Sequence, residues 1–151
     1  MKRKKESIMF QGFGHTAIWV KDMEKSLHFY LDILGCKKAF SMPLDGPGTG
    51  TEYLVASNGA FIELFYGGTP HETEKAPEGV HFTGFSHFCL VVDDMFKFVE
   101  EVESRGGVFR VKPKRGRDGN WQAWMTDPDG IEIEFVQLEP GCKQRQIYFE
   151  D

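Results

Sequence analysis

The sequence predicts an α+β fold in which two tandem βαβββ modules curl their sheets around a cleft. The main observation is that segment 12–25, GFGHTAIWVKDMEK, returns 72 residues later as GFSHFCLVVDDMFK at 84–97. Strand-like and helix-like segments then follow each copy in the same order. A chain of 151 residues is also long enough for one domain built of two small modules.

The two copies share more residues than chance provides. Eight of 24 positions are identical between 12–35 and 84–107, whereas average composition gives roughly one or two. We therefore predict an internal duplication within one domain at 12–138. Module one covers 12–66, a linker covers 67–83, module two covers 84–138, and 1–11 and 139–151 are tails.

Composition excludes several classes of protein. Apolar residues make up 40% of the chain, and the net charge is −5, so a folded protein with no nucleic-acid or membrane partner is expected. No apolar run approaches the roughly 20 residues that span a bilayer. Three cysteines without a CxxC spacing indicate neither disulfides nor a thiolate zinc site. The expected location is the cytoplasm, and the basic cluster Lys2–Lys5 is read as a solvated tail.

Module one begins with a predicted strand at 12–20 and a helix that Asp22 caps and Gly35 ends. Strands are predicted at 37–41, 52–56 and 60–66. A Gly- and Pro-rich loop at 42–50 separates the first two of these strands, and Asn58-Gly59 is a strong hairpin signal between the others.

Module two repeats this order after the polar linker. A strand is predicted at 85–92 and a helix at 94–105, which Gly106 and Gly107 close. The remaining strands are expected at 108–111, 120–126 and 131–137. Segment 112–119 is predicted as a polar loop, and the DPDG sequence at 127–130 as a tight turn.

Two histidines and two glutamates occupy matching places in the copies. His15 and His87 stand at offset 72, and Glu63 and Glu134 follow them by 48 and 47 residues inside apolar runs. Because strand side chains alternate, all four fall opposite the apolar residues that pack under the helices, and could face one cleft. Two imidazoles and two carboxylates suit a divalent metal with open positions for water or substrate. The ligand types leave Ni, Co, Zn, Mn and Fe open.

Simpler readings exist for each residue alone. A strand histidine is more often packed or exposed than a ligand, and a glutamate between isoleucines usually faces solvent. The matched spacing of both pairs favours the metal site. Other residues have weaker signals: His28, His71 and His81 have no counterparts, Cys89 needs only a packing role, and four aromatic residues are either core or the wall of an apolar substrate pocket, namely Trp19, Phe65, Trp121 and Trp124.

These motifs resemble the vicinal oxygen chelate superfamily, which contains glyoxalases, bleomycin-resistance proteins and extradiol dioxygenases. GHTAIWVKDMEKSLHFYLDILG is similar to its opening strand and helix, and DPDGIEIEF to its closing turn and strand. The resemblance implies a glyoxalase-like curled sheet with metal ligands His15, Glu63, His87 and Glu134. This ligand set resembles that of lactoylglutathione lyases, whereas methylmalonyl-CoA epimerases typically have Gln at the place of Glu63.

The resemblance departs at the thiol site. Similar lactoylglutathione lyases usually have Arg four residues after the first ligand and Asn four after the second, and both help to hold glutathione. This chain has Trp19 and Gly67 there, so use of a thiol cosubstrate stays open. A homodimer is also implied, with ligands from one subunit or two. A basic run suggests an anionic group on the ligand: Lys112, Lys114, Arg115 and Arg117.

The implied function is that of a metal-dependent lyase or isomerase that moves a proton next to a metal-bound carbonyl of a small substrate. Glu134 is the expected base, and Glu63 a ligand or second base. One alternative is an extradiol-type dioxygenase with His15, His87 and Glu134 as a facial triad. Another is a non-catalytic protein that binds a drug or other small molecule.

Overall fold

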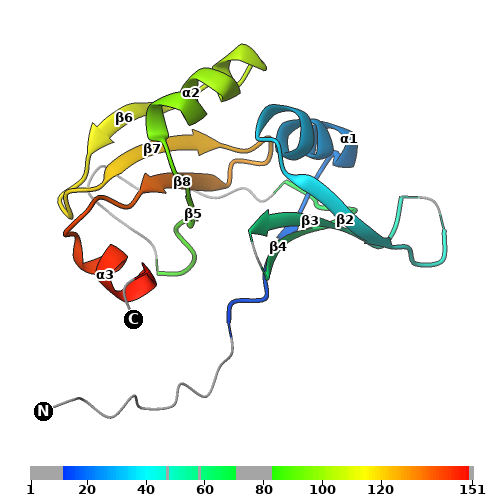
Figure 1. Ribbon diagram of the computed structural model, residues 1–151. Helices are drawn as coiled ribbons and strands as arrows, with labels where there is room; N and C mark the ends of the chain where they lie inside the picture. Colours follow the sequence, from blue (N-terminus) through cyan, green and yellow to red (C-terminus); the bar gives the residue numbers. More distant parts are fainter. Residues whose placement is uncertain (1–11, 47, 58, 71–82, 150–151) are drawn as a thin grey trace, which may run out of the picture.

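The computed structural model describes residues 12–46, 48–57, 59–70 and 83–149, which form two four-stranded sheets, each with its own helix (Figure 1). The strand order is β1-β4-β3-β2 in the first sheet and β5-β8-β7-β6 in the second. In each sheet the first strand pairs in parallel with the fourth, and the other neighbours are antiparallel. This repeated topology confirms the predicted α+β fold.

The elements of the first half are β1 His15–Trp19, α1 Met23–Leu27, the π-helical turn η1 His28–Ile33, β2 Lys37–Met42, β3 Thr51–Ser57 and β4 Ala60–Phe65. Those of the second half are β5 Phe88–Val91, α2 Met95–Ser104, β6 Val111–Arg115, β7 Trp121–Thr126, β8 Glu132–Gln137 and α3 Lys143–Phe149. None of the helices in the described ranges has the length and apolar character needed to cross a bilayer.

The two helices start in the same way because both copies keep an aspartate at the N-cap. Asp22 accepts a hydrogen bond from the backbone N–H of Lys25, and Asp94 accepts from those of Phe96 and Lys97. The predicted cap at Asp22 is confirmed. Gly35, at φ +79°, follows the end of the first helical segment, where only glycine is unstrained.

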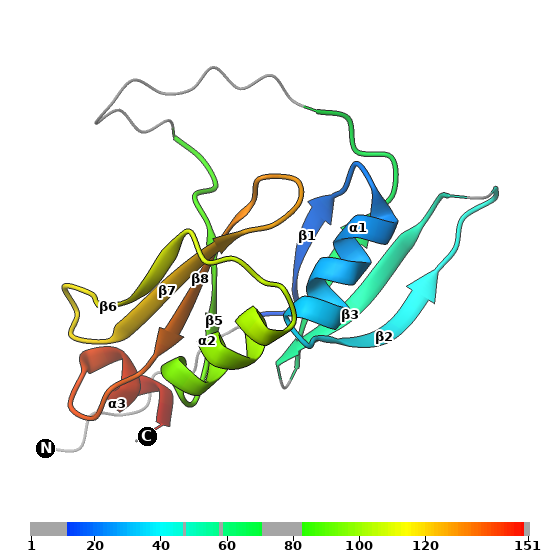
Figure 2. The same ribbon diagram turned by 90° about the horizontal axis from the view of Figure 1, so that it is seen from above.

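Each sheet has one face under a helix and one without. In the first sheet, Ile18, Ile62 and Leu64 are buried in the core, and in the second sheet Ile133 and Phe135 join the same cluster. Figures 1 and 2 show α1 and α2 on the same side of the two sheets. The opposite faces, called helix-free below because neither α1 nor α2 covers them, are therefore both turned away from that side. Helix α3 lies near the end of β8, on the side of the second sheet opposite α2 (Figure 1).

A turn of the second half holds the helix of the first. The fully buried Tyr30 donates its hydroxyl proton to the Asp127 carboxylate at 2.8 Å. Asp129 of the same turn accepts from the backbone N–H of Lys21 at 3.1 Å and from the Ser26 hydroxyl at 3.4 Å. Burial raises the pKa of Asp127. The predicted tight turn thus also fastens the two halves together.

The position of β6 differs from the prediction. A strand was expected at 108–111 and a loop at 112–119, but the strand is Val111–Arg115. β6 is the edge of its sheet, and its register with β7 shifts between Val111 and Lys114, which accommodates Pro113. Charged side chains suit an exposed edge, so the hydrophobic pattern could not reveal this strand.

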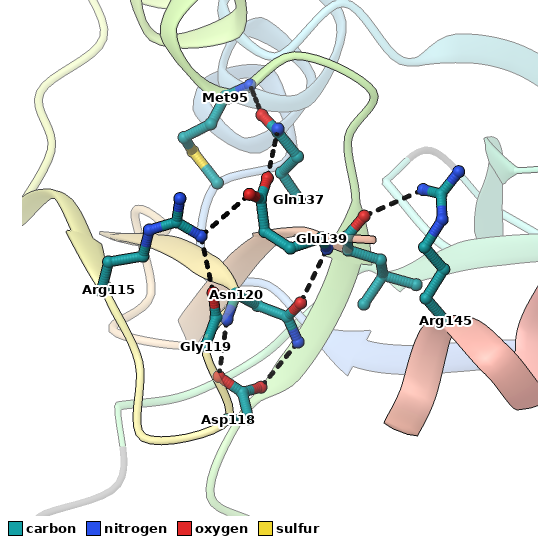
Figure 3. Close-up of polar contacts among 9 residues, drawn as sticks. Met95, Arg115, Asp118, Gly119, Asn120, Gln137, Glu139 and Arg145 are labelled. Carbon is teal, nitrogen blue, oxygen red and sulfur yellow. Dashed lines mark hydrogen bonds and ion pairs between the residues drawn. The ribbon is translucent and has the colours of Figure 1, made fainter. Parts of the chain in front are cut away.

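The predicted C-terminal tail contains α3, and a buried amide network lies before it (Figure 3). The Asn120 side chain donates to Asp118 at 2.8 Å and accepts from the backbone N–H of Glu139 at 2.9 Å. The Arg145 guanidinium of α3 donates to the carbonyl of Leu138 at 2.9 Å. These bonds connect the turn before β7, the end of β8 and α3. Other predictions lie outside the described residues, namely Lys2–Lys5, Asn58, His71 and His81.

We predict that Tyr30→Phe lowers the free energy of unfolding by about 1.5–3 kcal/mol, since it removes a hydrogen bond to a buried carboxylate. Burial raises the native pKa of Asp127 above its unfolded value, so between these two pKa values the native state binds more protons than the unfolded state. As the pH falls through the native pKa the carboxyl becomes neutral, and the cost of burying its charge disappears. The loss measured by urea unfolding should therefore shrink at acid pH. Tyr66→Phe, which removes a longer 3.3 Å bond to Glu52, is the matched control. Equal losses in both variants at every pH would contradict the prediction.

Candidate metal centre

The first histidine and the first glutamate lie together on the helix-free face of the first sheet. His15 begins β1, and Ala17 is the register partner of Glu63 on β4, so parity places both side chains on one face. The Nε2 atom of His15 lies 3.3 Å from Oε2 of Glu63. The carboxylate is buried, whereas the imidazole is about half exposed. We call these two residues the first half-site.

The second pair repeats this arrangement on the second sheet. Nε2 of His87, just before β5, lies 3.1 Å from Oε2 of Glu134 on β8. Nδ1 of His87 lies 3.1 Å from the Ser86 hydroxyl. A proton held on Nδ1 by Ser86 would leave the Nε2 lone pair free to bind a cation, as in many metal-ligating histidines. His87 and Glu134 form the second half-site.

Each half-site has an aromatic neighbour on its third strand. Tyr53 is the register partner of Glu63 and meets His15 edge-on, with ring centroids 6.0 Å apart. Trp124 is the partner of Glu134 and meets His87 edge-on at 4.7 Å. A hydrogen bond to the Glu63 carboxylate raises the pKa of Tyr53. Sequence reasoning missed Tyr53, although strand alternation could have placed it beside Glu63.

The four aromatic residues predicted for a substrate pocket divide between the two faces. Trp19 stacks on Phe65 on the face of the first half-site, with centroids 4.8 Å apart. Trp124 lies on the face of the second. Trp121 lies on the opposite face, where it meets Phe96 of α2 edge-on. Because residues three apart on a strand point to opposite faces, Trp121 packs under the helix and is left out of the candidate site.

The half-sites remain separate in one chain. Within the described ranges no three His, Cys, Asp or Glu residues are grouped so that they could hold a metal. Within each pair, however, the separation of nitrogen and oxygen suits a metal. Two neighbouring ligands that each lie about 2.1 Å from an octahedral cation are about 3 Å apart, close to the 3.3 and 3.1 Å found here.

A groove of about 650 Å³ lies between the two sheets, beside β1 and β5. Aromatic side chains line much of it, and of the four predicted ligands only His87 reaches it. Cys89 also lines the groove, and desolvation together with the nearby Glu134 charge raises the pKa of its thiol to about 12. A thiol with that pKa is protonated at neutral pH, so Cys89 is a poor thiolate ligand.

The basic run predicted near an anionic ligand is partly engaged elsewhere. Lys112 forms an ion pair with Glu103, and Arg115 pairs with Glu139 at 2.9 Å. Lys114 is the register partner of Gln122, on the face of the second half-site. Lys114 is therefore the member of the run that is best placed to meet a ligand there.

Comparison with known proteins gives consistent relatives. A probable lactoylglutathione lyase of Synechocystis is 35% identical over 131 residues, which cover 82% of this chain and 92% of the relative. A lactoylglutathione lyase of Neisseria meningitidis is 31% identical over 137 residues, covering 84% and 91%. These relatives match along nearly their whole length.

Solved structures show the same fold. A superfamily member from Sphaerobacter thermophilus is 28% identical with a TM-score of 0.63, covering 87% of this chain and all of that one. An antibiotic binding protein from Streptomyces, 20% identical, has a TM-score of 0.64, covering 88% and 100%. The model of the Glyoxalase/Bleomycin resistance protein/Dioxygenase superfamily matches residues 12–135. With this match across most of its length, the chain belongs to that superfamily.

Proposed function

We propose that this chain is a metal-dependent lyase or isomerase of the glyoxalase type. The observation that carries the proposal is the pair of matched half-sites, each with one imidazole nitrogen about 3 Å from one carboxylate oxygen. Curated relatives at 29–35% identity are named lactoylglutathione lyases, which supports the same reaction class. The proposed ligands are His15, Glu63, His87 and Glu134.

When bound, a divalent cation supplies positive charge that stabilises the negative charge developing on the substrate oxygen as a neighbouring C–H bond breaks. The chain's own contribution is to hold the donors and to move the proton. A carboxylate accepts the proton from one carbon and returns it to the adjacent carbon, so atoms and charge balance over the cycle. The fit leaves the metal open among Ni, Co, Zn, Mn and Fe.

We assign the proton transfer to Glu134. Both carboxylates are mostly buried, and the side chain of Glu134, at 14% exposure, is slightly more accessible than that of Glu63, at 8%. A carboxylate that meets solvent and substrate can exchange a proton more readily than an enclosed one. The family resemblance favours the same residue, with Glu63 mainly a ligand.

We further propose that two copies of the chain complete each centre. One chain presents its half-sites on two separate faces, and within the described residues these do not combine into one group. In a twofold dimer, the first half-site of one copy can face the second half-site of its partner. Such a dimer contains two complete centres, each with two nitrogen and two oxygen donors.

This arrangement predicts complementation between inactive variants. His15→Ala with Glu63→Ala removes the first half-site, and His87→Ala with Glu134→Ala removes the second. Each homodimer should retain no metal. After random exchange half of the dimers are mixed, and each mixed dimer keeps one intact centre, so metal content and turnover should return to roughly one quarter of the wild-type level. If subunits exchange but neither metal content nor turnover recovers, then all four ligands come from one chain or the proposed site is wrong.

Glu134→Gln should lower turnover by about 10²- to 10⁴-fold, because an amide cannot accept the proton. The measurement is isomerisation of the methylglyoxal hemithioacetals of several thiols, together with metal analysis and urea unfolding. The folding midpoint should stay unchanged. Glu132→Gln on the same strand is the control, because it makes the same change at a carboxylate that is paired with Arg110 at 2.6 Å and is not a proposed ligand. Unchanged turnover in Glu134→Gln would remove its assigned role, and oxygen consumption with a catechol would indicate the dioxygenase alternative instead.

A further inference from the structure

An aromatic stack lies beside the first half-site. Trp19 and Phe65 are register partners whose rings stack at 28°, and Trp19 is 64% exposed. Phe65 stands two residues after Glu63 on β4, which is a shift of about 7 Å along a strand. A ligand anchored near Glu63 can therefore reach the indole with a group no longer than one aromatic ring.

The stack belongs to a larger apolar wall on the same face. Phe40 stacks on Tyr53 with centroids 4.4 Å apart at 17°, on the other side of Glu63. Phe40 is 45% exposed, and Met42, further along β2 on the same face, is 53% exposed. Single exposed apolar residues need no explanation, but a contiguous group marks a binding surface. We call Trp19, Phe65, Phe40, Tyr53 and Met42 the aromatic wall.

The second sheet shows that the fold does not require this wall. Positions that serve the core stay apolar in both copies, as Ile62 and Ile133 do on the helix-covered faces. On the helix-free face, by contrast, the matched positions carry smaller apolar side chains. Val91, Val136 and Val111 stand at the places of Trp19, Phe65 and Phe40. Lys114 stands at the position that matches Met42. Lys114 pairs with the residue two before Trp124, just as Met42 pairs with the residue two before Tyr53. Within the described residues, stacked aromatic pairs therefore lie beside the first half-site and not beside the second.

The chemistry of the facing surface indicates what covers the wall. In the proposed dimer the wall meets the helix-free face of the partner's second sheet, where this chain carries the charged Lys114 and Arg110 among the apolar Trp124, Val91 and Val111. Packing those charged side chains against an indole and a phenyl ring would remove them from water without giving them hydrogen-bond partners, which is unfavourable. A flat apolar group of a small ligand, held between the two faces, satisfies the stack better.

We propose that the substrate of this chain carries a flat apolar group, of the size of a phenyl ring, that stacks on Trp19 and Phe65 while its vicinal oxygens reach the metal centre. The proposal rests on the proposed function and narrows its substrate class to aryl-substituted 2-oxoaldehyde adducts and related aryl compounds. Trp19 acts as a specificity-determining residue and takes no part in proton transfer.

The test compares the affinities of benzohydroxamate and acetohydroxamate, two chelators that differ in the phenyl group, for the metal-loaded protein by calorimetry. The wild type should bind the benzo compound at least about tenfold more tightly, and Trp19→Ala should lose about tenfold of that preference. Trp19→Phe should keep most of it. Phe96→Ala, a change at an exposed aromatic residue on α2, is the matched control and should leave the preference unchanged.

Kinetics give a second readout. With one thiol, the ratio of kcat/KM for the phenylglyoxal adduct to that for the methylglyoxal adduct should fall in Trp19→Ala, while turnover of the methylglyoxal adduct persists. Equal affinities for both hydroxamates in a wild type that retains metal and turns over substrate would overturn the inference and leave the proposed function standing. A wild type without metal and without turnover would overturn both.

Sedimentation distinguishes the substrate from a second copy of the chain. If Trp19→Ala dissociates the dimer and leaves the hydroxamate preference intact, the wall is a subunit contact and the inference is wrong. An intact dimer with a lost preference supports the substrate as the occupant.

Discussion

The alignment of β1 on β4, and of β5 on β8, is the constraint on which the rest of the structure depends. In each pair a parallel register puts the histidine and the glutamate on one face and the core residues on the other. A slip of one residue in β4 would turn Glu63 into the core beneath α1 and expose Ile62 and Leu64. Burying an unpaired carboxylate is costly, so the same register secures both the core and the half-site.

A second constraint fixes how the halves are joined. The turn at 127–130 holds the first helix through bonds to Tyr30, Lys21 and Ser26. Both helices lie on one side of the sheets, and within the described residues the two half-sites do not form one group of ligands. If the halves had to move to bring both half-sites to one cation within one chain, these bonds, of which that of Tyr30 is buried, would be disturbed. A partner copy could supply the missing half without such a change. This is the physical reason for preferring a dimeric centre.

The sequence predicts those strands and helices whose buried residues repeat with a fixed period. Alternating residues placed β1, β3, β4, β7 and β8 to within a few residues, because buried positions repeat with a fixed period. The cap at Asp22 and the closing glycines placed the helices. The edge strand β6 was predicted at 108–111 and lies at Val111–Arg115, and the segment that contains helix α3 was predicted as a tail. β6 is held by backbone pairing and ion pairs such as that of Arg115 with Glu139, and α3 lies after polar contacts around Asn120. Such contacts leave no hydrophobic period in the sequence.

The candidate site was predictable only in part for a related reason. Parity along a strand indicates that His15 and Glu63 share a face, and this was confirmed by the register. The alternation of side chains along a strand carries no information about how two sheets are oriented toward each other. That orientation involves contacts between residues far apart in the sequence, such as the bond of Tyr30 with Asp127. The expected meeting of all four ligands therefore stays a prediction for the assembled protein.

The duplicated half-sites have diverged in a way that suits different tasks. The Tyr53 hydroxyl is the hydrogen-bond donor beside the Glu63 carboxylate. The corresponding Trp124 contacts the ring of His87, and the donor beside the Glu134 carboxylate is the thiol of Cys89. A carboxylate held by a neighbouring hydroxyl is fixed in orientation, as a metal ligand should be. A thiol is a weaker hydrogen-bond donor than a phenol, so Glu134 is held less firmly and is freer to turn toward a substrate carbon and back. In the proposed mechanism, the exchange of tyrosine for tryptophan at one matched position thus assigns metal binding mainly to Glu63 and proton transfer to Glu134.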